Sequence, residues 1–295
     1  MNGAIRLIAV AAVIAASAPA QPPASAPADQ PTLILGAIKI ETAPIERQLA
    51  DKHTEKVRGV KFITGSLAGR PVVLARTGAG KVNAAMVATL AIEHFSPREV
   101  IFSGTSGGIG RVSVGDVVIA AKTAQHDFGI ITGTGFEPQL TADKETGAKA
   151  PIFYPADAAL LAAAQSAAET VELPVVETAA GPRQPVIVTG VVVTGDVFIA
   201  SSDKKGDLRE TFGALAVEME GAAVAAVCQK LKVPCLVIRS VSDSADEQAV
   251  QDFDSQAKAA AENAAAVTVA TVTELAATRD VSAAAPATTS PAPAR

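Results

Sequence analysis

The stretches ALAVEME at residues 214–220 and RSVSD at residues 239–243 decide the fold that the sequence predicts. The first joins an apolar strand to an alanine-rich helix, and the second closes another apolar, strand-like run. In an open α/β sheet, ligands bind in the crevice at the carboxyl ends of the strands. We therefore expect Glu220 and Asp243 to reach one crevice, with Arg239 beside Asp243.

Working outward, apolar runs of strand length alternate with segments of helical period. The expected strands are residues 32–37, 59–66, 71–76, 99–104, 116–120, 186–194, 214–217 and 234–239. The expected helices are residues 42–52, 81–95, 155–170, 219–231 and 253–277. Such alternation predicts βαβ units around a parallel sheet. We predict one α/β domain over residues 32–278, with a mixed, mainly parallel twisted sheet flanked by helices, and a long loop at residues 129–151.

The two ends of the chain differ from this domain. Residues 1–20 combine Arg6, an apolar run too short to span a bilayer, and small residues at 18–20, which is typical of a signal peptide. A buried N-terminal helix is the alternative, but a Pro/Ala-rich linker follows directly at residues 21–31. We expect a periplasmic or secreted protein without stable membrane association after signal cleavage, and a disordered tail at residues 279–295.

Composition argues against a nucleic-acid partner and against a disulfide bridge. Hydrophobic residues make up 49% of the chain and the net charge is −5, so the chain can bury a large core but offers no basic face for nucleic acid. Cys228 and Cys235 fall on a helix and the next strand, which favours buried free thiols over a disulfide bridge.

Two further motifs predict no site of their own. The run Gly78-Ala79-Gly80-Lys81 resembles a P-loop, but Ala75 replaces the first glycine and Val82 the serine or threonine, so we expect no nucleoside triphosphate. The pair His126-Asp127 could ligate a metal ion. The chain has only two other histidines, His53 and His94, and no spaced cluster, so we expect no metal and no organic cofactor.

A series of glycine turns follows the strand-like runs in a fixed order. They read GAIKIE at 36–41, RTGAGKVNAA at 76–85, GTSGG at 104–108, VGDVV at 114–118 and TGDVFI at 194–199. With the two stretches quoted first, this series resembles the nucleoside phosphorylase superfamily and, within it, the 5′-methylthioadenosine/S-adenosylhomocysteine nucleosidases, from about residue 32 to residue 274. The resemblance implies a nucleoside phosphorylase-like fold, hydrolysis of the N-glycosidic bond of an adenine nucleoside, and a homodimer.

The resemblance also assigns catalytic roles. Asp243 would be the acid that protonates purine N7, with Ser242 orienting it, and its pKa must be raised by burial to hold a proton near neutrality. Glu41 would polarise the attacking water, which Arg239 and Thr105 would help to hold. Thr105 stands where the family usually has serine. Without this context, a capping role for Asp243 and a helix-dipole role for Glu41 are the alternatives.

The remaining candidates would bind the substrate. Glu220 would accept hydrogen bonds from the ribose hydroxyls, and Met219 would pack on the sugar, although core packing explains Met219 equally well. Phe198 would stack on adenine, while the backbone of Ile199 would read the base edge. The other expected contacts are Gly107 of the glycine turn, and Ile38 and Phe253 in the pocket for the 5′-alkylthio group; the family usually has methionine in place of Ile38.

Two other functions remain open from sequence. A phosphorylase needs an anion site, but Phe102 stands where phosphorylases carry an arginine, and Glu41 would repel phosphate. Some members of the superfamily are storage or binding proteins without known catalysis. Retention of Glu41, Glu220 and Asp243 argues against that role, because a storage protein does not need them.

Overall fold

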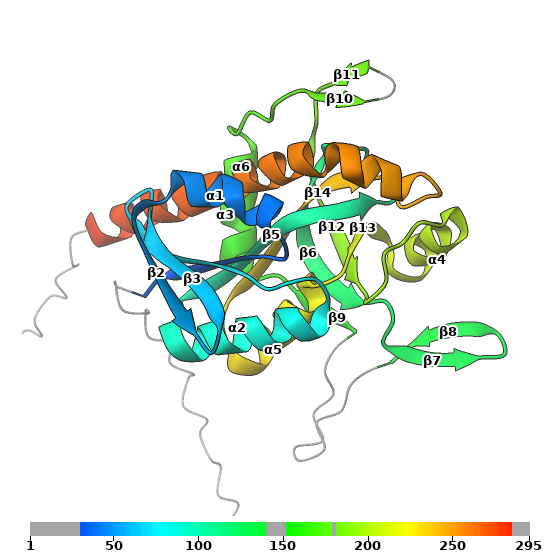
Figure 1. The fold of residues 1–295 in the computed structure, drawn as a ribbon, viewed down its shortest axis with the longest axis horizontal. Coiled ribbons are helices and arrows are strands. Elements are labelled where there is room, and N and C mark those ends of the chain that lie inside the picture. Colours follow the sequence, from blue (N-terminus) through cyan, green and yellow to red (C-terminus); the bar gives the residue numbers. More distant parts are fainter. Residues whose placement is uncertain (1–29, 140–151, 179–180, 285–295) are drawn as a thin grey trace, which may run out of the picture.

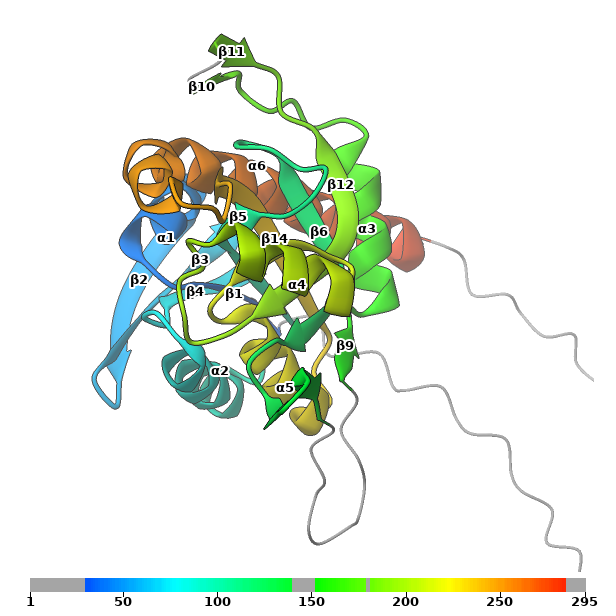
Figure 2. The ribbon, with the colours of Figure 1, turned by 90° about the vertical axis from the view of Figure 1, so that its right-hand side faces the viewer.

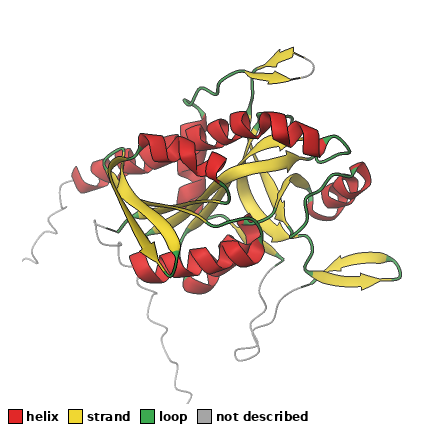
Figure 3. Ribbon diagram, in the orientation of Figure 1, coloured by secondary structure: helices red, strands yellow, loops and turns green. Residues whose placement is uncertain are grey.

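The computed structural model describes residues 30–139, 152–178 and 181–284. The predicted signal peptide at residues 1–20 lies outside the described residues, as do residues 21–29 of the linker and residues 285–295 of the tail. Within the described part, one α/β domain surrounds a ten-stranded sheet, as predicted (Figures 1 and 3).

The sheet is mixed and is built around buried apolar strands. Its order is β13 (Ala214–Glu218), β12 (Ile187–Thr194), β6 (Val117–Gln125), β14 (Cys235–Asp243), β5 (Glu99–Gly108), β1 (Thr32–Gly36), β4 (Arg70–Arg76), β3 (Val60–Leu67) and β2 (Ala50–Val57), with β9 (Phe153–Pro155) paired to β6. Parallel pairs join β5 to β1 and β14, whereas β14 pairs antiparallel with β6. Strands β1, β5 and β14 are buried along their whole length, which explains their continuous apolar runs.

Helices cover both faces of this sheet. One face carries α1 (Lys39–Gln48), α3 (Ala158–Ala168) and α6 (Ala249–Ala284), and the other carries α2 (Lys81–Phe95) and α5 (Gly221–Leu231) (Figure 1). Helix α4 (Ser202–Phe212) stands at the β13 end of the sheet (Figure 1). None of the helices in the described part of the chain combines the length and apolar character that a membrane span requires.

Small side chains let the helices approach the sheet closely. The core between α2, α5 and the sheet includes Ala84, Ala88 and Ala91 together with Ala222 and Cys228, all fully or almost fully buried. Because dispersion contacts require close approach, alanine-rich helices fill this layer without tryptophan, which the chain lacks. The thiols of Cys228 and Cys235 are both free and buried.

Several elements differ from the prediction. The helix predicted to end at residue 52 ends at Gln48, and residues 50–57 form the edge strand β2, because their charged side chains suit an exposed edge. The polar helix α4 was not predicted. The expected loop at residues 129–151 begins as a hairpin of β7 (Gly129–Thr132) and β8 (Gly135–Pro138), and residues 140–151 lie outside the described residues.

Two smaller differences concern α6 and a second hairpin. The expected helix at residues 253–277 is instead α6, which begins at Ala249 and ends at Ala284, so its last residues fall within the expected tail. Strands β10 (Val176–Thr178) and β11 (Gly181–Arg183) form a short hairpin that projects from the body (Figure 2). Arg183 anchors it through an ion pair of 2.7 Å with the buried Asp116.

The pairing of β5 with β14 positions the central polar residues. Arg239 lies opposite Gly104, Ser240 opposite Thr105, and Asp243 opposite Gly107. The register shifts between Val241 and Asp243, so Ser242 is an extra residue in β14. A bulge of this kind changes the direction of the following side chain. It explains how the consecutive residues Ser242 and Asp243 both reach the same cavity.

Candidate active site

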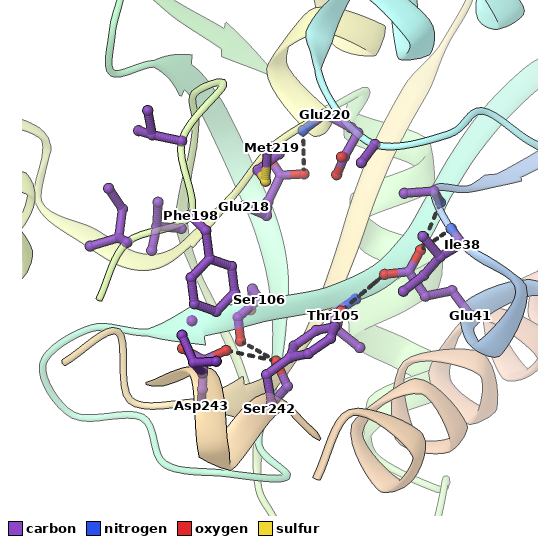
Figure 4. A pocket seen from close by; sticks show the side chains of 18 of the residues that line it. Ile38, Glu41, Thr105, Ser106, Phe198, Glu218, Met219, Glu220, Ser242 and Asp243 are labelled. Carbon is purple, nitrogen blue, oxygen red and sulfur yellow. Dashed lines mark hydrogen bonds between the residues drawn. The ribbon is translucent and has the colours of Figure 1, made fainter. Parts of the chain in front are cut away.

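A cavity of about 410 Å³ opens where the predicted strand ends meet (Figure 4). The predicted site residues that line it are Ile38, Glu41, Thr105, Gly107, Phe198, Ile199, Met219, Glu220, Ser242, Asp243 and Phe253. Arg239 is not among the lining residues, although its side chain contacts several of them. Glu218, which sequence reasoning did not single out, does line the cavity.

Glu41 is held by four donors at the start of α1. One carboxylate oxygen accepts the backbone N–H groups of Ala37 at 2.7 Å and Ile38 at 3.1 Å. The other accepts the backbone N–H of Thr105 at 2.8 Å and its hydroxyl at 3.0 Å. The glycine turn after β1 and the end of β5 thus fix both oxygens, and Thr105 supplies the hydroxyl that its position requires.

Arg239 lies behind the cavity and bridges three carboxylates. Its guanidinium forms an ion pair with Glu218 and lies 3.5 Å from Glu220 and 3.8 Å from Glu41. The side chain is fully buried, and its Cζ stands 4.4 Å from the centroid of the Phe102 ring. Gly104 makes room for it, because a Cβ there would stand 2.2 Å from Nη1. The single guanidinium of Arg239 therefore lies against three buried carboxyl groups.

Glu218 organises the backbone around that cation. Its carboxylate accepts hydrogen bonds from the N–H groups of Glu220, at 3.0 Å, and Gly221, at 2.7 Å, and from the Thr194 hydroxyl. It therefore caps the N-terminus of α5 while it pairs with Arg239. In the sequence, the two glutamates of EME look alike, and the only signal that distinguishes Glu218 is its place inside the strand.

Glu220 reaches the cavity from the start of α5. One of its oxygens accepts the N–H of Gly80 at 2.8 Å. Burial and the neighbouring Glu218 carboxylate raise the pKa of Glu220 to about 7, against the opposing effect of Arg239. A raised pKa in a cavity is typical of a functional carboxyl group. Arg239 thus offsets only part of the cost of a negative charge on Glu220 in the cavity.

This arrangement predicts a stability change in Glu220→Gln. Below about pH 4.5 the carboxyl is protonated in both states, whereas between its ordinary value of 4.5 and about 7 the folded state keeps a proton that the unfolded chain loses. Stability therefore falls as the pH rises through this window. We expect Glu220→Gln to raise the melting temperature more at about pH 8 than at about pH 5. Thermal scans at both pH values test it, with the exposed Glu210→Gln as control; an equal shift at both would contradict it.

Asp243 occupies the opposite end of the cavity from Glu41 (Figure 4). One oxygen accepts the N–H of Ala245 at 2.9 Å, and the other lies 2.9 Å from the Ser242 hydroxyl. Burial raises the pKa of Asp243, with smaller contributions from Asp252 and Asp246, against those two hydrogen bonds. Gly107 allows this approach, since a Cβ there would stand 2.9 Å from the carboxylate. Asp243 is therefore more ready than an exposed aspartate to carry a proton.

Aromatic side chains form the remaining wall. The rings of Phe198 and Phe253 meet edge to face, with centroids 5.9 Å apart. Phe198 is 46% exposed and lies beside Asp243 at the cavity (Figure 4). Ile199 follows it, while Met219 faces the cavity between Glu218 and Glu220. A flat apolar ligand fits against such a wall.

The His126-Asp127 pair belongs to no metal cluster. Among the residues that the structure describes, no group of three or more His, Cys, Asp or Glu side chains is placed to hold a metal ion. His126 is buried, which lowers its pKa, and its Nε2 has no hydrogen-bond partner among those residues. Asp127 pairs instead with Lys81 at 2.6 Å.

Known proteins resemble this chain in sequence and structure over most of its length. A family model described as the phosphorylase superfamily matches residues 31–273. A 5′-methylthioadenosine/S-adenosylhomocysteine nucleosidase of Shewanella denitrificans is 36% identical over 245 residues, covering 82% of this chain and 98% of its own. The crystal structure of such a nucleosidase from Neisseria meningitidis, in complex with methylthio-immucillin-A, is 34% identical with a TM-score of 0.70, covering 83% and 99%. The futalosine hydrolase of Helicobacter pylori is 32% identical with a TM-score of 0.71, covering 83% and 98%.

Proposed function

Because the chain belongs to the phosphorylase superfamily, we propose that its cavity hydrolyses the N-glycosidic bond of adenine nucleosides of the 5′-methylthioadenosine/S-adenosylhomocysteine type and releases adenine. The observation that carries this proposal is the convergence of Glu41, Glu220 and Asp243 on one cavity beside Phe198. Glycoside cleavage needs an acid on the leaving-group side and a base on the water side. Asp243 and Glu41, at opposite ends, are suited to these two tasks.

In this proposal Asp243 is the general acid. Its raised pKa favours a protonated carboxyl group, which can donate to adenine N7 as the bond breaks. The hydroxyl of Ser242 lies near two acceptors, the Asp243 carboxylate at 2.9 Å and the Ser106 carbonyl at 3.2 Å. The single hydroxyl hydrogen of Ser242 can bond to only one of these acceptors at a time. The hydroxyl can donate to the carbonyl while Asp243 holds its proton, and turn to the carboxylate once that proton has left.

Glu41 is the proposed base for the attacking water. Its four donors fix the place of the carboxylate, and the attacking water would replace one of them when Glu41 accepts its proton. As the bond breaks, the ribose gains positive charge. The negative charge of the carboxyl cluster around the single Arg239 guanidinium would stabilise that positive charge. Glu220 would accept hydrogen bonds from the ribose hydroxyls.

Water rather than phosphate is the proposed nucleophile. Phe102 is fully buried beneath Arg239, and the carboxylates already occupy that guanidinium, so no arginine is left to bind phosphate there. We expect the protein to convert methylthioadenosine into adenine and free 5-methylthioribose at the same rate with and without phosphate. Chromatography of the products tests this. Strict dependence on phosphate, with a ribose 1-phosphate product, would overturn it.

The apolar part of the cavity supports a 5′-alkylthio group. Ile38, Val250 and Phe253 line it, and none of them offers a polar side chain to a hydroxylated 5′ carbon. Burial of a methylthio group there gains roughly 1–3 kcal/mol per methylene-sized group over an exposed one. The proposed substrates therefore carry an apolar substituent at the 5′ position.

We also propose a homodimer. Large apolar side chains are exposed on α2, at Val82 and Met86, and on β7, at Ile130 and Ile131, the last being 85% exposed. Such exposure is typical of a protein–protein interface. The proposal places the β7–β8 hairpin near the interface. Light scattering tests it, and a monomer that stays fully active at low concentration would count against it.

Export is proposed on the sequence alone. The apolar run and the small residues at 18–20 support cleavage near Gln21 and a periplasmic or secreted mature chain without stable membrane association. N-terminal sequencing of the protein from its native host tests this, and retention of Met1 would refute it.

A further inference from the structure

The start of α2 binds two carboxylates, one from the residue before α5 and one from the loop after β12. The N–H of Gly80 donates to Glu220 at 2.8 Å, and the N–H of Lys81 donates to Asp196 at 2.7 Å. No side chain of α2 or its N-cap residue caps this end of the helix. Glu220 lines the cavity, whereas Asp196 stands two residues before Phe198. Glu220, which is proposed to hold the sugar, and Asp196, which stands near the proposed base-stacking Phe198 in the sequence, thus accept hydrogen bonds from adjacent N–H groups.

The side chain of Lys81 closes a ring around Asp196. Its ammonium pairs with Asp127 at 2.6 Å, donates to Gln125 at 3.3 Å, and lies 4.0 Å from Asp196. The second oxygen of Asp127 accepts the backbone N–H of Asp196 at 2.8 Å. Although burial opposes it, the hydrogen bonds from Lys81 and from the Asp196 N–H lower the pKa of Asp127, so its charge is maintained.

The backbone around this ring is closely fitted. Gly80 has φ +91°, and a Cβ there would stand 3.1 Å from the Asp196 carboxylate. A Cβ at Gly195 would stand 2.3 Å from Nε2 of the buried His126. Both glycines therefore allow approaches that other residues would prevent. The segment before Phe198 is held at a defined place against α2 and the end of β6.

The loop that follows lacks such support of its own. Val197 is 51% and Phe198 46% exposed, so little burial fixes them. Beyond Asp196, Phe198 meets Phe253 edge to face, Ile199 packs against a core cluster, and the N–H and hydroxyl of Ser202 both donate to Glu247, at 3.0 and 2.7 Å. On its N-terminal side, the direction of Phe198 is set by where Asp196 is held.

We propose that Lys81, Asp127 and Asp196 form a clasp of positioning residues that sets the place of Phe198 relative to Glu220, and hence of the base relative to the sugar. The clasp gives a role to the Gly78–Lys81 turn and to Asp127, for which the sequence predicted no site of their own. It touches no reacting atom. The inference rests on the proposed function, since it assigns base and sugar to these two side chains.

The variants Asp196→Ala, Asp196→Asn and Asp127→Ala test the clasp in the full-length protein. For Asp196→Ala we expect the KM for methylthioadenosine to rise about tenfold or more, the size of a lost charge-assisted hydrogen bond, with kcat within about threefold. Asp196→Asn keeps an oxygen for the Lys81 N–H and should recover most of the loss. Asp127→Ala should raise KM too, and the double alanine variant should raise it by less than the product of the two effects.

The control is Glu262→Ala, which removes an exposed ion pair of the same 2.6 Å length, to Arg47, away from the cavity. It should leave KM unchanged. Hydrogen exchange at residues 195–200 should accelerate in Asp196→Ala and in Asp127→Ala, which frees the Asp196 N–H, but not in Glu262→Ala. An unchanged KM in an active Asp196→Ala variant, or losses that multiply in the double variant, would overturn the clasp. If the wild type releases no adenine, the proposed function fails. The affinity for adenine, measured by calorimetry in the same variants, then decides the clasp: a tenfold loss supports it and no loss overturns it.

Discussion

Asp243→Asn is expected to reduce adenine release about 10²–10⁴-fold, the usual cost of losing a general acid. The amide is nearly isosteric and can still donate a hydrogen bond to N7, but it cannot transfer a proton. The departing adenine would then keep its negative charge. Burial raises the pKa of Asp243, which is the direction that this step requires.

Binding should suffer much less than turnover in this variant. Phe198 and Glu220 still contact the base and ribose in the proposed complex. The amide oxygen can accept the Ala245 N–H, and the Ser242 hydroxyl, which now donates to the other oxygen, can turn to accept from the NH2 group. The measurement compares kcat for methylthioadenosine with the affinity for a non-hydrolysable analogue. Ser242→Ala is the matched control, because it removes the hydroxyl but keeps the acid, and should cost less. Turnover of Asp243→Asn within a few-fold of wild type would leave Asp243 as a structural cap only.

Glu41→Gln is the second variant with a large expected effect, again about 10²–10⁴-fold in kcat. Each oxygen of Glu41 accepts two hydrogen bonds, from Ala37 and Ile38 on one side and from Thr105 on the other. A glutamine places an NH2 donor against two of these donors in either orientation. The variant therefore loses both the base and the fixed geometry, and we expect a lower melting temperature together with lost turnover.

Thr105 provides the matched control for Glu41. Thr105→Ser keeps the hydroxyl and the N–H that bind Glu41, and should retain activity near wild type. Thr105→Val removes only the hydroxyl hydrogen bond of 3.0 Å, and its activity should lie between those of Thr105→Ser and Glu41→Gln. Single-turnover rates and thermal scans of the four proteins separate chemistry from stability. A Glu41→Gln protein that keeps more than about a tenth of the wild-type rate would exclude Glu41 as the base.

The sequence was sufficient to predict the site where residues follow strand ends. Asp243 closes β14 and Glu220 follows β13, so alternation of strands and helices already brought them to one edge of the sheet. The orientation of Arg239 could not be predicted in this way. It was expected to hold water, whereas the structure places it behind the cavity against Phe102 and Glu218.

Other features depend on contacts that no local pattern reveals. Glu218 differs from Glu220 only because its hydrogen bonds come from Thr194, Gly221 and Arg239, residues brought together by the fold. The bulge at Ser242 is visible only in the register of β14 against β5. The edge strand β2 and helix α4 carry mostly polar side chains, so their apolar periodicity was too weak to predict them.

The residues that line the cavity differ in their freedom of motion, because some belong to the paired strands β5 and β14 and others do not. Thr105 and Gly107 lie on one strand and Asp243 on its neighbour, so their spacing cannot change without breaking buried backbone hydrogen bonds. Phe198 and Phe253 lie outside the sheet and are only partly buried. An arriving ligand therefore meets Thr105, Gly107 and Asp243 in a fixed arrangement, which we call the chemical half of the cavity. Only the aromatic half, Phe198 and Phe253, adjusts to the ligand. Rates of ligand entry and escape follow the aromatic half, while the barrier to bond cleavage follows the chemical half. An inhibitor can therefore gain residence time from contacts with Phe198 and Phe253 without resembling the transition state that the residues of β5 and β14 surround.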